Sequence, residues 1–378
     1  MHALARGVSA LFVFVIAGAA SACSTPSPAV EVDAGSEADA SPVCPAMPTP
    51  EPFVKGPHVL PLDGVLRVSH VQAKATHNSY HLMPKDPIPD WRYEHLPLGE
   101  QLAKQGVRGV ELDIHWDDEC QRYRVFHIGL LDDGTTCTYL TDCLVALRTF
   151  SKENPGHHPI FVQIEPKFAS SPATDGERLA ALDREVLSVF DKAWIVRPDD
   201  VKGGSASVAA GLEVRGWPTL GEARGRFVFY LNTGGAIRDA YTSGRKDLDG
   251  KVMFAEGTLG EPFVGVQVSN GPEDTKAIEA ALAKNVIVRT RADSNPGTVR
   301  AGDTASREVA LASGAHIVST DFPAPVPGLD YALTIPDGTP SRCNPKTAPR
   351  SARRSRSKTR RSSESSPIVN VDDCVRQR

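Results

Sequence analysis

The sequence lacks three features that would each have suggested a different kind of protein. No two cysteines have the spacing of a zinc knuckle, which argues against a small zinc-binding domain. No GxGxxG turn opens the first βα unit, which counts against a dinucleotide-binding fold. The apolar run at residues 8–20 is short for a transmembrane helix. What remains is an ordinary globular composition over 378 residues, 40% hydrophobic and 23% charged.

The N-terminus has the pattern of an export signal. Arg6 precedes the apolar run, and Ala20-Ser21-Ala22 offers a small-residue cleavage site. Cys23 follows at once, so the junction is similar to a bacterial lipobox with Ala in place of the usual Leu. We therefore expect a signal peptide at 1–22. The mature protein is then either a membrane-anchored lipoprotein, lipidated on Cys23, or a secreted protein cleaved near Ala22.

The chain beyond the signal begins with a segment that cannot build a core. Residues 23–52 are rich in Ser, Pro, Ala and acidic side chains, which predicts a flexible linker. Export implies an oxidising environment, and the six cysteines beyond Cys23 are an even number that fits disulfides. Among them, Cys137 and Cys143 are close enough in sequence to bridge one loop to the next helix.

The C-terminal residues 346–378 break the pattern of the rest of the chain. They contain ten Lys/Arg and three Asp/Glu in a chain whose net charge is −4. The segment has no apolar periodicity, which predicts disorder. One interpretation is a basic arm that touches anionic lipid. The other is an appendage without a part in catalysis, or an artefact of the reading frame.

From about residue 66 to 330 the chain alternates strand-like and helix-like segments, which argues for a parallel sheet and predicts one domain at 53–345. The number of strands favours a closed (β/α)8 TIM-type barrel over an open doubly wound sheet. The expected strands are 71–76, 107–114, 123–128, 159–165, 226–231, 251–255, 263–268, 285–290 and 315–319. The expected helices are 98–105, 140–153, 176–192, 273–284 and 303–313.

Carboxylates lie at the ends of two predicted strands. Glu111 and Asp113 are two residues apart, so both side chains share one face, and His115 follows on that face. Glu165 ends the strand PIFVQI, and Lys167 lies two residues on. Carboxylates in a barrel mouth need a compensating charge, and hard cations such as Ca²⁺ take oxygen ligands. The Lys167 ammonium is then available for a phosphate. The alternative is an ordinary network of ion pairs with Arg and Lys.

Two histidines lie at strand ends beside these carboxylates. His77 ends the first strand and precedes Asn78, and His127 ends the strand YRVFHI. Catalytic residues of barrels come from the carboxyl ends of the strands. Histidines for proton transfer beside oxygen ligands for a metal suit the cleavage of a phosphodiester.

Several further polar residues have less certain partners. Arg291 ends the strand VIVRT and Asp321 follows the last strand, so they either bind substrate oxygens or pair with each other. His81 is expected to line the entrance of the site. His157 and His158 precede Pro159 at a turn and are expected to be solvated.

These motifs together resemble the Ca²⁺-dependent phosphoinositide-specific phospholipase C family of bacteria, a group with a phospholipase-C-like phosphodiesterase barrel. The resemblance covers roughly residues 66–345 and rests on ATHNSYH, VELDIHWD, VFHIG, QIEPK and HIVSTDFP. It implies Ca²⁺ as the cofactor and His77 and His127 as the catalytic histidines. It implies four Ca²⁺ ligands: Asn78, Glu111, Asp113 and Glu165.

The resemblance also implies a reaction. The enzyme would cleave the glycerol–phosphate bond of phosphoinositides at a membrane surface, giving diacylglycerol and an inositol phosphate by general acid/base catalysis. No nucleic acid or protein partner is implied. One rival is a glycerophosphodiester phosphodiesterase, which Glu165-Pro166-Lys167 fits, although its first histidine normally precedes Arg-Gly and not Asn-Ser. Others are a sphingomyelinase-D-like diesterase and a non-catalytic surface lipoprotein that binds headgroups.

Overall fold

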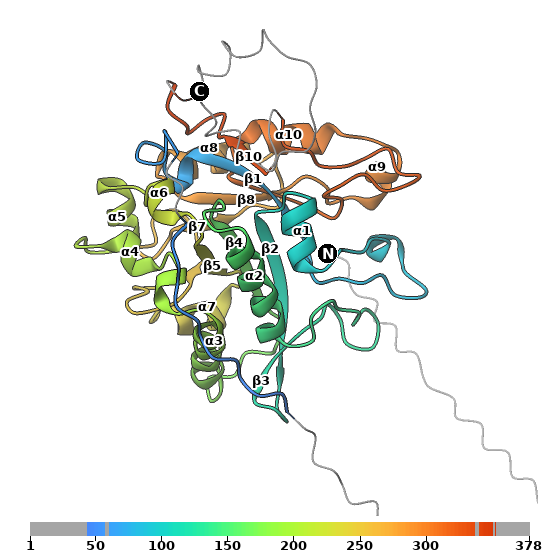
Figure 1. Ribbon diagram of the computed structural model, residues 1–378, viewed down its shortest axis with the longest axis horizontal. Helices are drawn as coiled ribbons and strands as arrows, with labels where there is room; N and C mark the ends of the chain where they lie inside the picture. Colours follow the sequence, from blue (N-terminus) through green and yellow to red (C-terminus); the bar gives the residue numbers. More distant parts are fainter. Residues whose placement is uncertain (1–43, 57–59, 337–339, 351, 353–378) are drawn as a thin grey trace, which may run out of the picture. The chain divides into compact units, whose positions relative to one another are not determined.

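Eight parallel strands form the centre of the fold and follow one another around a nearly closed barrel (Figure 1). The structure is a computed structural model that describes residues 44–56, 60–336, 340–350 and 352. The barrel strands are β1 (Val71–Thr76), β2 (Gly109–Asp117), β4 (Ile160–Pro166), β5 (Phe227–Leu231), β6 (Phe254–Ala255), β7 (Val266–Val268), β8 (Ile287–Arg291) and β9 (Ile317–Thr320).

The strands are hydrogen-bonded in the order β6-β5-β4-β2-β1-β9-β8-β7. A single parallel bridge between Glu256, just after β6, and Val266 of β7 joins the two ends of this row. The (β/α)8 barrel expected from the alternation is thus confirmed. Its strands are apolar and buried because the barrel interior covers one face and the surrounding helices cover the other.

Helices surround the barrel, and several neighbours in space pack against each other: α1 with α2, α2 with α3, α3 with α7, and α8 with α10 (Figure 1). Their bounds are α1 (Leu98–Lys104), α2 (Leu140–Glu153), α3 (Asp175–Val189), α4 (Pro198–Lys202), α5 (Val208–Val214), α6 (Leu220–Ala223), α7 (Gly235–Tyr241), α8 (Thr275–Ala283), α9 (Pro296–Arg300) and α10 (Ala305–Ser313). The five predicted helices are present. The short α4–α7 and α9 were not predicted, because one or two turns carry little periodicity.

One predicted strand has a different place from the others. The segment expected at 123–128 forms β3 (Arg122–Val125), which runs antiparallel to the outer part of β2 and is not a barrel strand. Its register pairs Ile114 with Val125 and Asp117 with Arg122. The β2–β3 hairpin thus leaves the barrel mouth and returns to it, so the residues after β3 lie over the mouth.

The linker predicted for 23–52 ends earlier than expected. A disulfide joins Cys44 to Cys120 in the β2–β3 turn. Glu51 forms an ion pair with Arg148 at 3.1 Å, and Phe53 packs on Trp194 with ring centroids 5.1 Å apart. Residues 44–52 are therefore held against the barrel. The predicted signal peptide, Cys23 and the rest of the linker lie outside the described residues.

The C-terminal boundary is also later than predicted. A short strand, β10 (Ser341–Cys343), pairs antiparallel with β1, and the chain stays packed beyond it. Ala348 and Ala352 are buried, and Lys346 forms an ion pair with Glu279 at 3.3 Å. The basic tail predicted from residue 346 therefore begins with packed residues. The remainder of that prediction falls outside the described part of the chain.

Other predictions of the sequence can be checked in the same way. The Cys137–Cys143 disulfide is confirmed. His157 and His158 are not solvated but buried, where they contact the hydroxyls of Ser151 and Ser341.

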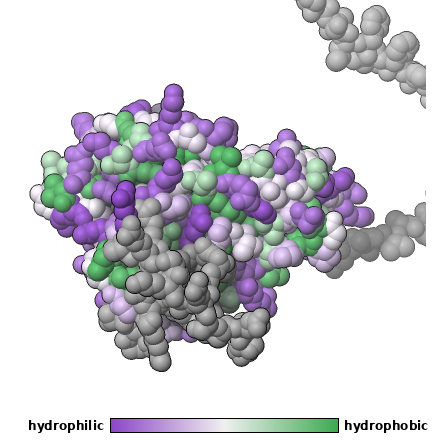
Figure 2. Space-filling view, turned by 90° about the horizontal axis from the view of Figure 1, so that it is seen from above, coloured by the Kyte–Doolittle hydropathy of each residue, from purple (hydrophilic) through white to green (hydrophobic). Residues whose placement is uncertain are grey.

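Hydrophobic and hydrophilic residues are interspersed on the face seen in Figure 2. Among the residues that the structure describes, no helix is both long and apolar enough to cross a membrane.

Candidate active site

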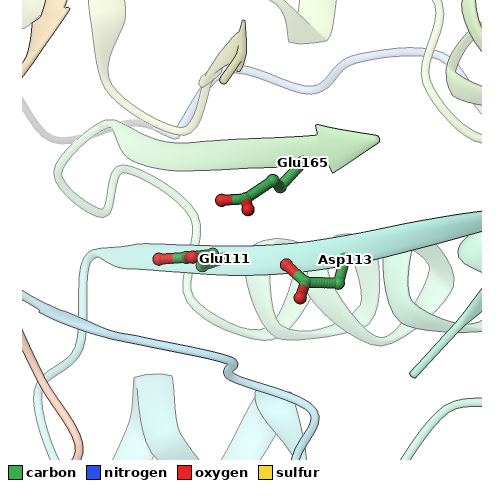
Figure 3. Close-up of side chains that lie close together, drawn as sticks. All are labelled: Glu111, Asp113 and Glu165. Carbon is green, nitrogen blue, oxygen red and sulfur yellow. The ribbon is translucent and has the colours of Figure 1, made fainter. Parts of the chain in front are cut away.

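Three carboxylates meet at the carboxyl ends of β2 and β4. The parallel register places Asp113 directly beside Glu165, and Glu111 lies two residues earlier on the same face of β2. One carboxylate oxygen of each residue lies within 4.8 Å of the other two. Figure 3 shows the three side chains on two neighbouring strands. The convergence predicted from the alternation of the two strands is therefore present.

Two cations contact these carboxylates. Nη2 of Arg289, a buried residue of β8, donates to Oε2 of Glu111 at 2.6 Å. Nζ of Lys167 lies 3.2 Å from Oδ2 of Asp113 and also contacts Oε1 of Glu165. Arg289 was not singled out from the sequence. The available signal was its position two residues before Arg291, on the same face of the strand.

Asp113 shows that these contacts do not satisfy the cluster. Its side chain is fully buried, and apart from the ion pair of Oδ2 with Lys167 no hydrogen bond reaches its carboxylate oxygens among the described residues. Burial and the neighbouring Glu111 raise the pKa of Asp113 well above its usual range. Burial acts on Glu111 in the same direction, but Arg289 and His77 hold its pKa below the ordinary value.

The donor set fits a hard divalent cation. With all three carboxyls ionised, Arg289 neutralises one, two negative charges remain on the buried Asp113 and the partly buried Glu165, and Ca²⁺ takes carboxylate and amide oxygens. The predicted fourth ligand, Asn78, is buried on the turn after β1. Its amide nitrogen donates to the Tyr93 hydroxyl at 3.1 Å, and in the described structure its amide oxygen accepts no hydrogen bond.

The turn that carries His77 and Asn78 is fixed from both sides. Asn78 has φ of +42°, a left-handed conformation that Asn tolerates better than most residues. The backbone N–H of Ser79 donates to the Glu111 carbonyl at 3.0 Å, and the Glu111 N–H donates to the Ser79 hydroxyl at 2.8 Å. Gln101 of α1 donates to the Ser79 carbonyl at 2.6 Å. The first histidine is thereby tied to the strand that bears the carboxylates.

His77 links the carboxylate cluster to a second acidic group. Its Nδ1 is 2.8 Å from Asp321, and its Nε2 is 3.9 Å from Glu111. Asp321 also accepts from Nη2 of Arg291 at 2.9 Å, so the pairing of Arg291 with Asp321 is confirmed. Burial would raise the pKa of Asp321, but Arg291 and His77 hold it well below its usual range. The same arginine contacts Asp293, whose pKa is raised to about 7 by burial and by Asp321.

His127 has a carboxylate partner of its own that sequence reasoning missed. Asp132 is fully buried and holds two histidines, with Oδ2 at 2.7 Å from Nδ1 of His127 and Oδ1 at 2.8 Å from Nε2 of His81. His81 is completely buried and stacks on Tyr93 with ring centroids 4.4 Å apart. The expectation that His81 lines the entrance is therefore wrong. His81 lies behind the site and supports Asp132.

A cavity of about 230 Å³ brings the two histidines to one space. His77, Asn78, His127 and Arg291 all line it, together with residues of the loop before α1 and of α9. The three carboxylates are not part of the cavity wall. His77 lines the cavity and also contacts Glu111, so it links the cavity to the carboxylate cluster. His115 points elsewhere. It stacks on Phe126 with ring centroids 3.7 Å apart, although its strand face suggested a place in the site.

The sequence of residues 121–345 matches the family of Ca²⁺-dependent phosphoinositide phospholipases C. The chain belongs to this family. The protein is thus a phosphoric diester hydrolase of the phosphoinositide phospholipase C type, and Ca²⁺ is its cofactor. The matched segment contains His127 and Glu165. It begins after β1 and β2, so His77, Asn78, Glu111 and Asp113 lie outside it, and the fold brings them beside Glu165 and His127.

Solved structures with the same fold come from two bacteria. The chain is similar to a calcium-dependent phosphoinositol-specific phospholipase C from a Pseudomonas species, with 18% identity over 75% of this chain and 97% of that one, and a TM-score of 0.56. It is also similar to a Ca²⁺-dependent phosphatidylinositol-specific phospholipase C from Streptomyces antibioticus, with 18% identity, 68% and 96% coverage and a TM-score of 0.51. No curated protein matches the sequence. At this identity, the structural likeness supports the fold of the phospholipase.

Proposed function

We propose that the enzyme cleaves the glycerol–phosphate bond of phosphoinositides and releases diacylglycerol and an inositol phosphate. The observation that carries this proposal is the pair of histidines, each held by a carboxylate, in one cavity beside the carboxylate cluster. In this reaction the inositol 2-hydroxyl attacks phosphorus and the bond from phosphorus to the glycerol oxygen breaks. One proton leaves the hydroxyl and another reaches the departing oxygen.

The histidines are suited to move these protons. Nδ1 of His77 faces Asp321 and Nδ1 of His127 faces Asp132. A carboxylate at Nδ1 favours the tautomer with the proton on that nitrogen, which leaves Nε2 as the atom for proton exchange with the substrate. The attacking hydroxyl passes its proton to a histidine or to a carboxylate of the cluster. The protonated histidine then supplies the proton of the leaving group.

The metal ligands in this proposal are Asn78, Glu111, Asp113 and Glu165. When bound there, Ca²⁺ supplies Lewis acidity, which polarises the phosphate and lowers the pKa of the attacking hydroxyl. Asn232 holds Glu165 in place by donating to its Oε2 at 2.8 Å. Binding of substrate phosphate by Lys167 and Arg291 stays a prediction, because both cations contact carboxylates in this structure.

Exposed apolar side chains beside the site support action at a membrane surface. The loop after β3 presents Leu130, which is 96% exposed, and Leu131, which is 64% exposed. Leu130 has φ of +67°, a conformation that is costly for a leucine. Leu82 is also exposed, and its N–H donates to the Gly134 carbonyl at 3.2 Å, so the loops that follow His77 and His127 lie side by side. Such a rim can enter the lipid interface while the headgroup reaches the cavity.

A panel of phosphodiesters, assayed with and without a chelator, tests the proposed reaction. Phosphatidylinositol vesicles should release diacylglycerol, the release should stop in excess EGTA, and added Ca²⁺ should restore it. Release of glycerol 3-phosphate from glycerophosphodiesters, without diacylglycerol release, would instead indicate a glycerophosphodiester phosphodiesterase. Binding of vesicles without turnover would indicate a headgroup-binding protein.

The location of the enzyme is a separate part of the proposal. The Ala-Ser-Ala-Cys junction supports lipidation of Cys23, with the segment after it as a tether. Stable anchoring requires more than one acyl chain, which a bacterial lipoprotein carries. Cys23→Ser should release the protein from the membrane fraction. A wild-type protein that is fully soluble outside the cell would favour simple secretion.

A further inference from the structure

The two cations of the carboxylate cluster are held in different ways. Arg289 is 3% exposed and contacts three groups, Glu111, Ser319 and Asn270. Its planar guanidinium is therefore surrounded by partners on neighbouring strands and loops. Replacing it would leave several buried groups without their bonds, so Arg289 is a fixed part of the barrel interior.

Lys167 is held only by its ammonium. It follows β4, where its backbone N–H donates to the Ile114 carbonyl at 2.9 Å, and its side chain is 29% exposed. Nζ contacts Asp113 and Glu165, and these are its ion pairs within the described residues. The four-carbon side chain rotates freely once those contacts are lost. Lys167 can thus leave the cluster without any change in the backbone.

The charges favour such an exchange. With Arg289 in place, the three carboxylates keep two negative charges, and one ammonium neutralises only half of this. A divalent cation matches it fully. The oxygens of Asp113 and Glu165 that contact Nζ belong to the carboxylates that converge with Glu111 on one point. Ammonium and metal therefore compete for the same ligands.

We propose that Lys167 is an exchangeable counter-ion, which holds Asp113 and Glu165 in the metal-free enzyme and is displaced when Ca²⁺ binds. The released ammonium then lies at the mouth, one side-chain length from the cluster, where it binds the substrate phosphate. Ca²⁺ and an anionic phosphodiester therefore bind with positive coupling, since each favours the same position of Lys167. The inference rests on the proposed metal ligands, but it does not depend on which lipid is the substrate.

Calorimetric titration of Ca²⁺ into the full-length, metal-free protein tests the exchange. Lys167→Met removes the competing charge, so it should bind Ca²⁺ about tenfold tighter than the wild type, a change of about 1.4 kcal/mol. The matched control is Lys202→Met, because Lys202 also pairs with a carboxylate, Asp249 at 2.5 Å, and is 20% exposed. The control should bind Ca²⁺ like the wild type. Equal or weaker binding by Lys167→Met would overturn the proposal.

Thermal unfolding gives a second readout that needs no catalysis. Metal-free Lys167→Met should unfold at a lower temperature than the wild type, and Ca²⁺ should raise its midpoint by more. Lys167→Gln removes the same charge and takes its place if the methionine variant does not fold. Equal midpoint gains in variant and wild type would count against the exchange.

The coupling can be measured with dimethyl phosphate as a simple phosphodiester. Dimethyl phosphate should tighten Ca²⁺ binding to the wild type, and this effect should be weaker in Lys167→Met, where only the direct attraction between metal and phosphate remains. Coupling of undiminished strength in the variant would contradict the second role of Lys167. A wild type that binds no Ca²⁺ would overturn the metal site as well. Intact exchange without phosphatidylinositol cleavage would overturn only the proposed substrate.

Discussion

The buried carboxylates at the two ends of the barrel differ in how the protein compensates their charge. At the amino end, Asp63 receives two bonds from Nε of Arg224, at 2.8 and 2.9 Å, and a third from the Leu60 N–H at 2.9 Å. At the carboxyl end, Asp113 is as deeply buried, but its one ion pair among the described residues is with the partly exposed ammonium of Lys167 at 3.2 Å. The protein itself compensates the charge of the Asp63 carboxylate, whereas the carboxylate cluster around Asp113 needs an added cation.

This difference indicates that buried carboxylates contribute to stability at the amino end of the barrel and to function at the carboxyl end. A buried ion pair with good geometry holds its elements together, and losing one partner is costly. A buried carboxylate whose charge is only partly compensated destabilises the metal-free fold, and a protein keeps such a group where a ligand completes the compensation. The amino end of this barrel is thus built for folding and the mouth for binding a metal.

The largest effect should come from breaking the buried ion pair at the amino end of the barrel. Asp63→Asn removes a buried ion pair, and we expect the free energy of unfolding to fall by about 3–5 kcal/mol. Urea denaturation with Ca²⁺ present measures this change. The folded fraction should keep wild-type turnover, since Asp63 is not part of the cavity wall. Loss of turnover in fully folded Asp63→Asn would contradict the separation of the two ends.

The next effect concerns the histidines of the mouth. His77→Ala and His127→Ala should each lower turnover by roughly 100-fold or more, the usual size of an acid–base contribution. Unfolding midpoints should change little, because both side chains are partly exposed, at 23% and 22%. His115→Ala is the matched control, since His115 lies on the same strand as the carboxylates but faces Phe126. Near wild-type turnover of either active-site variant would make that histidine peripheral.

Neutralising Asp113 should change stability in the direction opposite to Asp63. Burial and Glu111 raise its pKa in the folded protein, so the metal-free protein loses stability as the pH rises from the ordinary carboxyl pKa toward the raised one. Asp113→Asn removes this loss. At pH 8 without metal it should be more stable than the wild type, by on the order of 1–2 kcal/mol. Melting curves between pH 5 and 8 measure the difference, and a variant less stable than the wild type at every pH would refute it.

The smallest effect should come from the apolar rim. Leu130→Ser with Leu131→Ser removes two exposed leucines next to His127. Burying each in a lipid interface is worth up to about 1.5–3 kcal/mol, so cleavage in vesicles should fall several-fold or more. Turnover of a soluble short-chain substrate should stay unchanged. Val214→Ser is a control, because Val214 is 76% exposed but belongs to α5. Equal losses on both substrates would indicate damage to the site.

Much of the carboxylate cluster and of the long elements could be predicted from the sequence. Alternation placed Glu111 and Asp113 on one face, and the adjacent strand end of Glu165 completed the cluster. The helix at 140–153 was predicted with its observed ends because fourteen residues carry a clear periodicity. Local pattern was sufficient where an element is long or a strand ends in several polar residues.

The remaining features depend on contacts between distant segments. Asp132 partners His127 only because the β2–β3 hairpin folds back over the mouth, which no local pattern indicates. Arg289 reaches Glu111 across the barrel interior, 178 residues away in sequence. Residues 44–52 have the composition of a linker, but a disulfide and the ion pairs of Glu51 with Arg148 and Lys152 fix them to the barrel. These contacts form only when the barrel closes, so the composition of each segment does not indicate them.

The most direct test titrates Ca²⁺ into metal-free wild type and Asp113→Asn and follows two signals, heat of binding and release of diacylglycerol from phosphatidylinositol vesicles. The account predicts that both signals in the wild type saturate at the same Ca²⁺ concentration, and that the variant gives neither. Full turnover of the wild type in chelator, or unchanged Ca²⁺ binding by Asp113→Asn, would contradict it.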